Sequence, residues 1–414
     1  MRGTGDSGVS AEPPRILLIV ENVSIARDHR LRKQVAALDC AGYRVAVICR
    51  RDPANSVPDG VRLLEYPAPA DARSFAGFLR EYAYSWAAAG WLTVRLLRDG
   101  GLDAIQISGT PDIYFALAAP LRLFGKRVVL DQRDLSPEIY ELRFQRRGAI
   151  YWLLRMLERA SYRSVDHVMT VNATLAATVR RRGRAAADAV SIVGNGPVLS
   201  HTAPRPADVG LRAGRAHLCC WLGVMGPQDQ LSLALHAVAH FVHVLGRTDC
   251  HFAFIGDGES RADAEQLADR LGIAPFVSFP GWLHEEDVFR YLSSADIGLE
   301  SNLEDIVSPV KAMEYMAFAL PIVAFDVAET RTLAGEAATY VEPADVAAMA
   351  GALAALLDDP RRRRTMGSHG RSRVENSLAW DHQQQAYLEI YGRLLLPAGH
   401  HSDAAHCARA ESAA

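Results

Sequence analysis

The stretch that decides the expected fold is SPVKAMEYMAFALPIVAF, residues 308–325. Its first half predicts an apolar helix with Lys311 and Glu314 on adjacent turns, and a tight loop then leads into a buried strand at 321–325. Such a strand, flanked by helices, belongs to a parallel sheet that binds ligands near strand carboxyl ends and helix starts. Charged side chains in so apolar a helix need partners. Either Lys311 and Glu314 pair on a solvated face, or Glu314 accepts hydrogen bonds from a nucleotide ribose while Lys311 faces its phosphates.

The same alternation of apolar runs and amphipathic segments continues along the chain, which is the pattern of a doubly wound parallel sheet. Two series of expected strands can be recognised: 15–20, 44–49, 61–65, 103–107, 127–131, 167–171 and 190–193, then 217–222, 251–255, 276–279, 296–299, 321–325 and 338–341. Between the series, residues 199–216 lose periodicity and read as a linker. We therefore expect an α/β protein with two Rossmann-like domains that face a central cleft.

Residues 308–325 resemble the donor-site helix of glycosyltransferase family 4, the retaining sugar-nucleotide transferases of GT-B fold, and the resemblance extends from about Arg15 to Tyr391. It implies that Glu314 holds the ribose of a nucleoside-diphosphate sugar. It also implies a domain order, in which small polar ends flank the folded part. The expected segments are a disordered start at 1–13, an acceptor-side domain at 14–198, a linker at 199–216, a nucleotide-sugar domain at 217–378, a helix returning to the first domain at 379–396 and a disordered tail at 397–414.

Length and charge agree with two domains of different character. A chain of 414 residues with 49% hydrophobic content is long enough to bury two cores. Residues 1–200 carry 28 Lys or Arg against 20 Asp or Glu, and the remainder carries 17 against 28. An acidic second domain repels phosphate backbones and no nucleic-acid reader motif occurs, so nucleic acid is not an expected partner.

Two predicted basic helices bear on whether the protein contacts a membrane. No run of 18 apolar residues and no hydrophobic signal region occurs, so we expect a cytoplasmic protein. Residues 78–98 and 146–163 combine aromatic or aliphatic side chains with arginines. They either pack on the first sheet or contact an anionic membrane at the inner face of the cell membrane, as a lipid-linked acceptor would require.

Donor-binding residues are expected in the second domain. Gly256, Asp257 and Gly258 follow a predicted strand and precede a helix, so their backbone could face the nucleotide or only allow tight packing. The first acidic residue of the family's Glu-x7-Glu pattern falls at Ile306, so the sugar contacts pass to Asp305, Glu304 or the backbone of Val307 and Ser308.

Further candidates lie in the first domain. The family's histidine position is occupied by Arg133, which cannot act as a base but could bind the leaving diphosphate, with Asp134 orienting the loop. Alternatively, Arg133 pairs with Asp131 or Asp134 and locks the loop. The first loop offers three residues that could contact phosphate or acceptor, or form a helix-start salt-bridge cluster: Arg27, Asp28 and Arg30. Asn195 resembles the family's Asn-Gly turn at the hinge.

The resulting hypothesis is a hexosyltransferase that uses a nucleoside-diphosphate sugar as co-substrate and a hydroxyl acceptor, which is a glycan, a lipid-linked molecule or a small molecule. Arg133, Asp134 and Lys311 are the expected catalytic residues. No cofactor and no metal are expected, because no Asp-x-Asp cation motif occurs. A non-catalytic sugar-binding relative and a sugar-nucleotide epimerase are the alternatives, and the arginine in the histidine position disfavours the epimerase.

Overall fold

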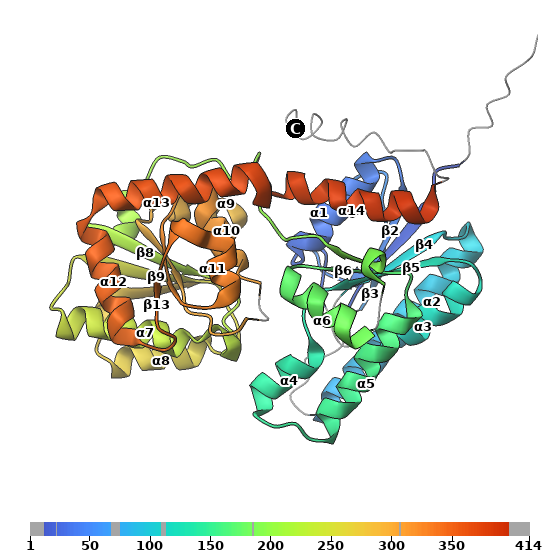
Figure 1. The fold of residues 1–414 in the computed structure, drawn as a ribbon, viewed down its shortest axis with the longest axis horizontal. Helices are drawn as coiled ribbons and strands as arrows, with labels where there is room; N and C mark the ends of the chain where they lie inside the picture. Colours follow the sequence, from blue (N-terminus) through green and yellow to red (C-terminus); the bar gives the residue numbers. More distant parts are fainter. Residues whose placement is uncertain are drawn as a thin grey trace, which may run out of the picture.

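The computed structural model describes residues 12–21, 23–67, 75–108, 113–183, 186–305 and 308–396. They form two lobes, each built on a parallel sheet with helices on both faces (Figure 1). The expected α/β class with two Rossmann-like domains is confirmed. The thirteen predicted runs all overlap strands, with ends that differ by at most two residues.

The first sheet has seven parallel strands in the order β3-β2-β1-β4-β5-β6-β7. The order in which successive strands are added to the sheet reverses between β1 and β4. The carboxyl ends of these two strands therefore form the topological switch point, where ligands of open α/β sheets bind. The strands are β1 (Arg15–Val20), β2 (Arg44–Arg50), β3 (Arg62–Tyr66), β4 (Ala104–Ser108), β5 (Arg127–Gln132), β6 (His167–Thr170) and β7 (Val190–Ile192).

The second sheet has six parallel strands in the order β10-β9-β8-β11-β12-β13, and its switch point lies between β8 and β11. Residues of β8 alternate between two buried layers, Cys219 and Trp221 on one face, Leu218 and Cys220 on the other. The strands are β8 (His217–Leu222), β9 (Cys250–Ile255), β10 (Val277–Gly281), β11 (Ile297–Glu300), β12 (Ile322–Phe325) and β13 (Ala338–Val341).

Helices cover both faces of each sheet. In the first domain α1 and α14 bury one face, and α2, α3, α5 and α6 the other. In the second, α7, α8 and α12 lie opposite α9 and α10. The α-helices are α1 (His29–Cys40), α2 (Phe75–Asp99), α3 (Phe115–Leu123), α4 (Ser136–Phe144), α5 (Ala149–Ser164), α6 (Ala173–Gly183), α7 (Leu231–Ala239), α8 (Arg261–Arg270), α9 (Glu285–Ser294), α10 (Val310–Ala317), α11 (Ala328–Ala334), α12 (Val346–Asp358), α13 (Pro360–Arg373) and α14 (Trp380–Leu395). Among the shorter helices, η3 (Pro227–Asp229) matters for the site.

The last helix, α14, crosses from the second lobe and lies beside α1 of the first (Figure 1). Tyr387 and Tyr391 donate hydrogen bonds of 2.8 and 2.7 Å to the buried side-chain oxygen of Gln106 on β4. Gln106 in turn donates to Gln34, which donates to Asp131 at the end of β5. Because each of these polar groups is buried and bonded, the network anchors α14 in the first domain.

The crossing point is closely packed. A Cβ on Gly196 would lie 1.7 Å from the carbonyl oxygen of Leu378, so only glycine permits this approach. The backbone N–H of Trp380 donates to the carbonyl of Pro197 at 2.9 Å. The turn that begins at Asn195 therefore lies where the chain leaves and re-enters the first domain. Of the predicted disordered ends, only Glu12 and Pro13 lie within the described residues.

Candidate functional site

Lys311 of α10 lies among carboxylates of its own domain. Its Nζ is 2.9 Å from Oδ1 of Asp229, at the end of η3, and 3.5 Å from Oε1 of Glu300, at the end of β11. It also lies 4.4 Å from the centroid of the Trp221 ring. Burial alone would lower the pKa of Lys311, but the charges of Glu300 and Asp229 outweigh it and raise the pKa. Lys311 therefore compensates two carboxylates at the switch point of the second sheet.

Glu314, one turn further along α10, is half-buried, and among the ion pairs of the described residues there is none between it and Lys311. Within the described part of the chain, no group donates a hydrogen bond to its carboxylate. Burial raises the pKa of Glu314 to about 7, although the charges of Lys33 and Lys311 oppose this. The structure thus separates the two charged residues of the helix: Lys311 is bonded to Asp229, and the carboxylate of Glu314 accepts no hydrogen bond from any described residue.

Lys33 of α1 comes toward Glu314 from the first domain. Its Nζ donates to Oδ1 of Asn195 at 3.0 Å and to the carbonyl of Gly196 at 2.7 Å. Both acceptors are neutral, so the charge of Lys33 is not compensated by them. Burial lowers the pKa of Lys33 to about 7, the charge of Arg30 adds to the effect and that of Glu314 opposes it. The two domains therefore bring a cation and a carboxylate into electrostatic contact.

Lys33 was not among the predicted site residues, although the sequence holds a signal for it. Only three of the 45 basic residues are lysines, and another of the three, Lys311, lies in the motif that decided the fold. Because the chain uses arginine almost everywhere else, a lysine marks its position as a candidate functional residue. What the sequence does not contain is the neighbourhood of Lys33, since Asn195 lies 162 residues further along.

The turn at 256–258 packs closely against the loop that follows β8. A Cβ on Gly256 would lie 1.8 Å from the carbonyl oxygen of Gly223, and one on Gly258 would lie 2.5 Å from that of Met225. The N–H of Gly256 donates to the carbonyl of Gly281, and that of Gly258 to Oδ1 of Asp257. The two N–H groups are thus already engaged, and the glycines allow the turn to lie against the loop that follows β8.

The loop before α10 is only partly described. Asp305 is exposed, and its Oδ1 accepts a hydrogen bond of 2.8 Å from the backbone of Ala328, at the start of α11. Ser308 is half-buried, and its carbonyl accepts from the N–H of Val310. Val307 and Ile306 lie outside the described residues. The predicted roles of these residues in sugar binding stay predictions.

In the first domain Asp131 joins two arginines. Arg30 is 3% exposed, and its Nε and Nη2 donate hydrogen bonds to the carboxylate of Asp131. Its Nη1 donates to the backbone carbonyls of Val193 and Gly194. Burial alone would raise the pKa of Asp131, but Arg30 and Arg133 hold it at about 2. Arg30 is therefore committed to the core of the first domain, as the salt-bridge interpretation expects.

Arg133 is held by two aspartates, Asp131 and Asp28. Asp131 is one of the two partners that the sequence suggested, whereas the other, Asp134, forms no ion pair with Arg133 among the described residues. The Nε of Arg133 is 3.0 Å from Oδ2 of Asp131 and its Nη1 is 2.6 Å from Oδ2 of Asp28. Asp28 also caps α1 by accepting from the N–H of Leu31. The third nitrogen of Arg133, Nη2, is buried and has no hydrogen-bond partner among the described residues.

The remaining first-domain candidates are more exposed. Arg27 is 73% exposed in its side chain and lies 3.6 Å from Asp52. Asp134 is exposed, and its carbonyl accepts a short hydrogen bond from Gln132. Arg27 therefore lies apart from the cluster of Asp28, Arg30 and Arg133.

Further direct contacts join the two domains. Arg143, on α4, is 2.9 Å from Oε2 of Glu259 in the second domain. Thr174, on α6, donates a short hydrogen bond to Glu329 on α11. The described candidates Lys33, Arg133, Asn195 and Glu314 come from four separate segments of the chain, and the fold brings them to one region.

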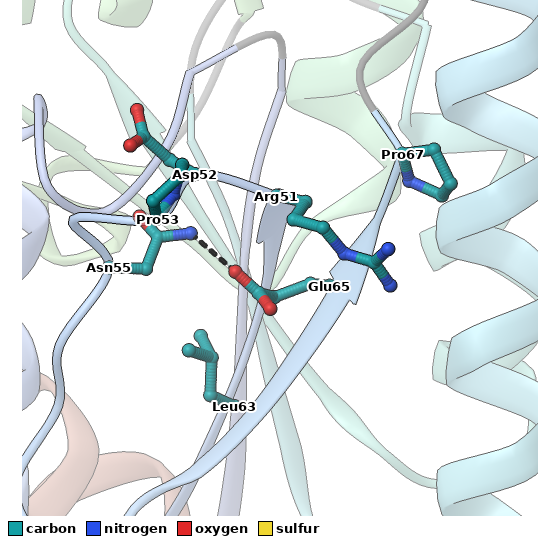
Figure 2. Close-up of a pocket in the computed structure, with 7 residues that line it drawn as sticks. All are labelled: Arg51, Asp52, Pro53, Asn55, Leu63, Glu65 and Pro67. Atoms are coloured by element: carbon teal, nitrogen blue, oxygen red, sulfur yellow. Dashed lines mark hydrogen bonds between the residues drawn. The ribbon is translucent and has the colours of Figure 1, made fainter.

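A pocket of about 570 Å³ lies elsewhere, at the carboxyl ends of β2 and β3. Figure 2 shows its lining, in which Asn55 donates to Glu65 at 2.7 Å. Asp52, another lining residue, accepts from Ser24. The pocket is formed by the first domain alone and contains none of the predicted site residues: its lining is Arg51, Asp52, Pro53, Asn55, Leu63, Glu65 and Pro67.

In the described ranges, no group of three or more His, Cys, Asp or Glu side chains is arranged to hold a metal ion. No helix in the same ranges is long and apolar enough to cross a membrane.

Comparison with known families decides the class of protein. A family model described as "Glycosyl transferase 4-like domain" matches residues 28–196, and one described as "Glycosyl transferases group 1" matches residues 216–359. The chain belongs to the family 4-like glycosyltransferases. The two models divide this glycosyltransferase as its two sheets do, and together they cover Lys33, Arg133, Asn195, Lys311 and Glu314.

Curated relatives of this glycosyltransferase are also sugar transferases. MMP alpha-(1->4)-mannosyltransferase of Mycolicibacterium hassiacum is 25% identical over 276 residues, which is 64% of this chain and 63% of that relative, less than two thirds of its length. The 2-deoxystreptamine glucosyltransferase of Streptomyces kanamyceticus is 24% identical over 84% of this chain and 91% of its own.

Solved structures show that the fold is GT-B. Sucrose-phosphate synthase from Thermosynechococcus elongatus superposes with a TM-score of 0.76 at 19% identity, covering 92% of this chain and 99% of its own. HepE from Anabaena, solved in complex with UDP-glucose, gives a TM-score of 0.69 at 14% identity over 92% and 99% of the two chains.

Proposed function

We propose that this glycosyltransferase moves a hexose-type sugar from a nucleoside-diphosphate sugar to a hydroxyl acceptor, with retention at the anomeric carbon. The observation that carries the proposal is Glu314, a half-buried carboxylate without a hydrogen-bond partner in the described residues, opposite Lys33 of the other domain. A carboxylate can accept from both hydroxyls of a ribose, and a nearby ammonium suits the attached diphosphate. The donor would therefore bind between the domains.

Two first-domain groups are suited to the diphosphate. Within the described residues, the ammonium of Lys33 is bonded only to neutral oxygens, and Nη2 of Arg133 is a buried donor without a partner. Lys311 remains a proposed phosphate contact, but its positive charge also balances the negative charges of Asp229 and Glu300. Preorganised cations of this kind stabilise the charge that develops on a leaving phosphate.

The proposed chemistry needs no protein base. The bond between the anomeric carbon and the phosphate oxygen breaks, and the acceptor oxygen forms a bond to the same face of that carbon. The proton of the acceptor hydroxyl passes to the departing phosphate oxygen. Arg133 stays protonated throughout and stabilises that oxygen. We also propose that no metal or other cofactor takes part, and expect an excess of chelator to leave turnover unchanged.

The acceptor remains a class: a glycan, a lipid-linked molecule or a small molecule. Relatives named as mannosyl-, glucosyl- and kanosaminyltransferases support a hexose-type donor and differ in the acceptors that their names state. Fold similarity cannot narrow this further.

Thermal unfolding with a panel of UDP-, GDP-, ADP- and dTDP-sugars tests the proposal, because a bound donor raises the melting temperature by mass action. One donor should stabilise the protein, and Glu314→Ala should remove the effect by weakening binding roughly 10- to 100-fold. The matched control is Glu286→Ala, an exposed glutamate of the same domain on α9. Stabilisation that survives in Glu314→Ala, or no response to any donor, would contradict the proposed site. Binding without turnover on any acceptor would favour a non-catalytic relative.

We further propose peripheral contact with an anionic membrane through α5. Trp152, Leu153 and Met156 are 63%, 48% and 61% exposed there, whereas Leu154 and Leu157 of the same helix are half-buried. Arg159 and Arg163 on the same helix are exposed as well. Exposed apolar side chains beside arginines suit an anionic interface. Sedimentation with phosphatidylglycerol vesicles should be reduced by Trp152→Ser with Met156→Ser, and binding equal to wild type would contradict the contact.

A further inference from the structure

Glu21 follows the last residue of β1, the strand beside the switch point of the first sheet. It is 4% exposed, and neither Oε1 nor Oε2 has a hydrogen-bond partner among the described residues. Ligands of doubly wound sheets bind at this position. The chain therefore places an unpartnered carboxyl group where the first domain would meet a ligand.

The alternation of β1 shows which layer Glu21 faces. Leu17 and Ile19 belong to the core layer formed with α2 and α3, and Glu21 continues the same alternation. Glu81 of α2 is 8% exposed and close enough that its charge, after burial itself, helps to raise the pKa of Glu21 to about 9. Burial and the charge of Glu21 raise the pKa of Tyr114 in turn, and the Tyr114 hydroxyl has no partner in the described chain.

Positive charge is scarce in this group. Arg50, at the end of β2, lies 3.8 Å from Oε1 of Glu81. No ion pair reaches Glu21 within the described ranges, whereas the buried Asp131 of the same sheet has two arginines. A buried carboxyl group without a partner destabilises the fold. A leucine or glutamine would serve packing better, so stability does not account for Glu21.

We propose that the carboxyl edge of the first sheet binds the acceptor through an amino group, which donates to Glu21 and lies between Glu21 and Glu81. This inference rests on the proposed function, since it names the chemical class of the acceptor. An ammonium group supplies the positive charge and the donors that Glu21 lacks among the described residues. A neutral hydroxyl in its place would supply a donor but no counter-charge for Glu21, because Arg50 lies beside Glu81.

Calorimetric titration of the full chain with matched pairs of small molecules tests the inference. The probes are streptamine against scyllo-inositol and D-glucosamine against D-glucose, in which amino groups replace hydroxyls on the same ring. Wild type should bind the amine at least about tenfold more tightly in one pair, as a charged hydrogen bond implies. Glu21→Gln should abolish the preference, and Glu81→Gln should reduce it.

The matched control is Glu65→Gln, since Glu65 lies on β3 of the same sheet and bonds Asn55 on the opposite face. It should retain the preference. Melting temperature gives a second readout: Glu21→Gln should match or exceed wild type at pH 7, whereas a structural role predicts a loss. Equal binding of amine and hydroxyl, binding of neither, or a preference that persists in Glu21→Gln would overturn the inference. Nucleotide binding is measured separately, so failure of the donor site and failure of this site give different results.

Discussion

The carboxyl edges of the two sheets can be compared residue by residue. Each edge holds one buried carboxylate that is paired within its domain, Asp131 with Arg30 and Arg133 in the first and Glu300 with Lys311 in the second. Each also holds one carboxyl group without a hydrogen-bond partner among the described residues, Glu21 and Glu314. Paired groups account for stability, and the unpaired ones are the candidates for ligand binding.

The difference lies in what faces the unpaired group. Glu314 is half-buried and meets the charge of Lys33 from the opposite domain, whereas Glu21 is 4% exposed and has another glutamate as its nearest charged influence. A ligand of Glu314 can therefore be anionic elsewhere, as a nucleoside diphosphate is. A positively charged group on a ligand of Glu21 would stabilise the ionised form of that carboxyl group. Two sheets of similar topology thus provide one site suited to a ligand with an anionic group and one suited to a ligand with a cationic group.

Removing the paired carboxylate of the first edge should have the largest effect. Asp131→Ala leaves Arg30 and Arg133 buried without their shared counter-charge, and we expect the free energy of unfolding to fall by about 4 kcal/mol. Urea denaturation measures it. The exposed Asp134→Ala, three residues along, is the control and should stay within about 0.5 kcal/mol of wild type. Similar losses in both variants would show that Asp131 is not the anchor.

The paired residue of the second edge should come next. Lys311→Met removes the cation between Asp229 and Glu300, and a loss of about 3 kcal/mol is expected by the same denaturation assay. Lys126→Met is the comparison, because Lys126 lies 4.0 Å from Asp103 and both side chains are substantially exposed. That control should lose less than about 1 kcal/mol. Wild-type stability of Lys311→Met would mean that the two carboxylates do not need it.

The unpaired groups should differ in pH dependence. The pKa of Glu21 is raised from 4.5 to about 9, so the folded state keeps a proton that the unfolded state loses above pH 4.5. Unfolding free energy of wild type should then fall relative to Glu21→Gln by about 3 kcal/mol from pH 4.5 to 7, and continue to fall toward pH 9. The pKa of Glu314 is raised only to about 7, so the curve for Glu314→Gln should be similar up to about pH 6.5 and then level off, and the two variants should differ mainly between about pH 7 and 9.

Denaturation at several pH values measures both curves. Parallel curves for the two variants would remove the contrast between the edges. A curve for Glu21→Gln that is flat against wild type would mean that Glu21 is already ionised and paired in solution.

The smallest effect is expected between the domains. Arg143 and Glu259 form an ion pair in which both side chains are 50% exposed, so Arg143→Ala should change stability by less than about 0.5 kcal/mol. Donor binding should stay unchanged as well, and a double-mutant cycle with Glu259→Ala separates the pair from each residue alone. A coupling above about 1 kcal/mol would instead identify this contact as a latch between the domains.

Much of the fold could be predicted because it depends on local patterns. Apolar runs of strand length alternate with helical segments, and this period is written in the sequence whatever the partners are. The helix 379–396 was expected from the resemblance, and α14 occupies nearly the same residues. The glycines at 256 and 258 show the limit of such reasoning, since the pattern suggested free N–H groups and the structure shows donors already engaged.

The site was less predictable because its electrostatics depend on distant residues. Arg30 and Asp131 are 101 residues apart, and Lys33 meets Asn195 across 162. A motif can nominate Glu314 and Lys311, but it does not show that Asp229 and Glu300 occupy the lysine. Likewise, the sequence shows only that Glu21 follows a strand. That its carboxyl group is buried without a hydrogen-bond partner among the described residues is visible only in the structure.

Local order in the chain is sufficient for the helices, the strands and the two-domain plan, since each segment carries its own period and its own breaks. The charge state of each site is a different matter, because it is set by burial and by partners that only folding brings together. Glu21, Glu300 and Glu314 are the same amino acid in the sequence. Three environments, with a neighbouring glutamate, with a bound lysine and with a lysine across the domain boundary, give them different roles.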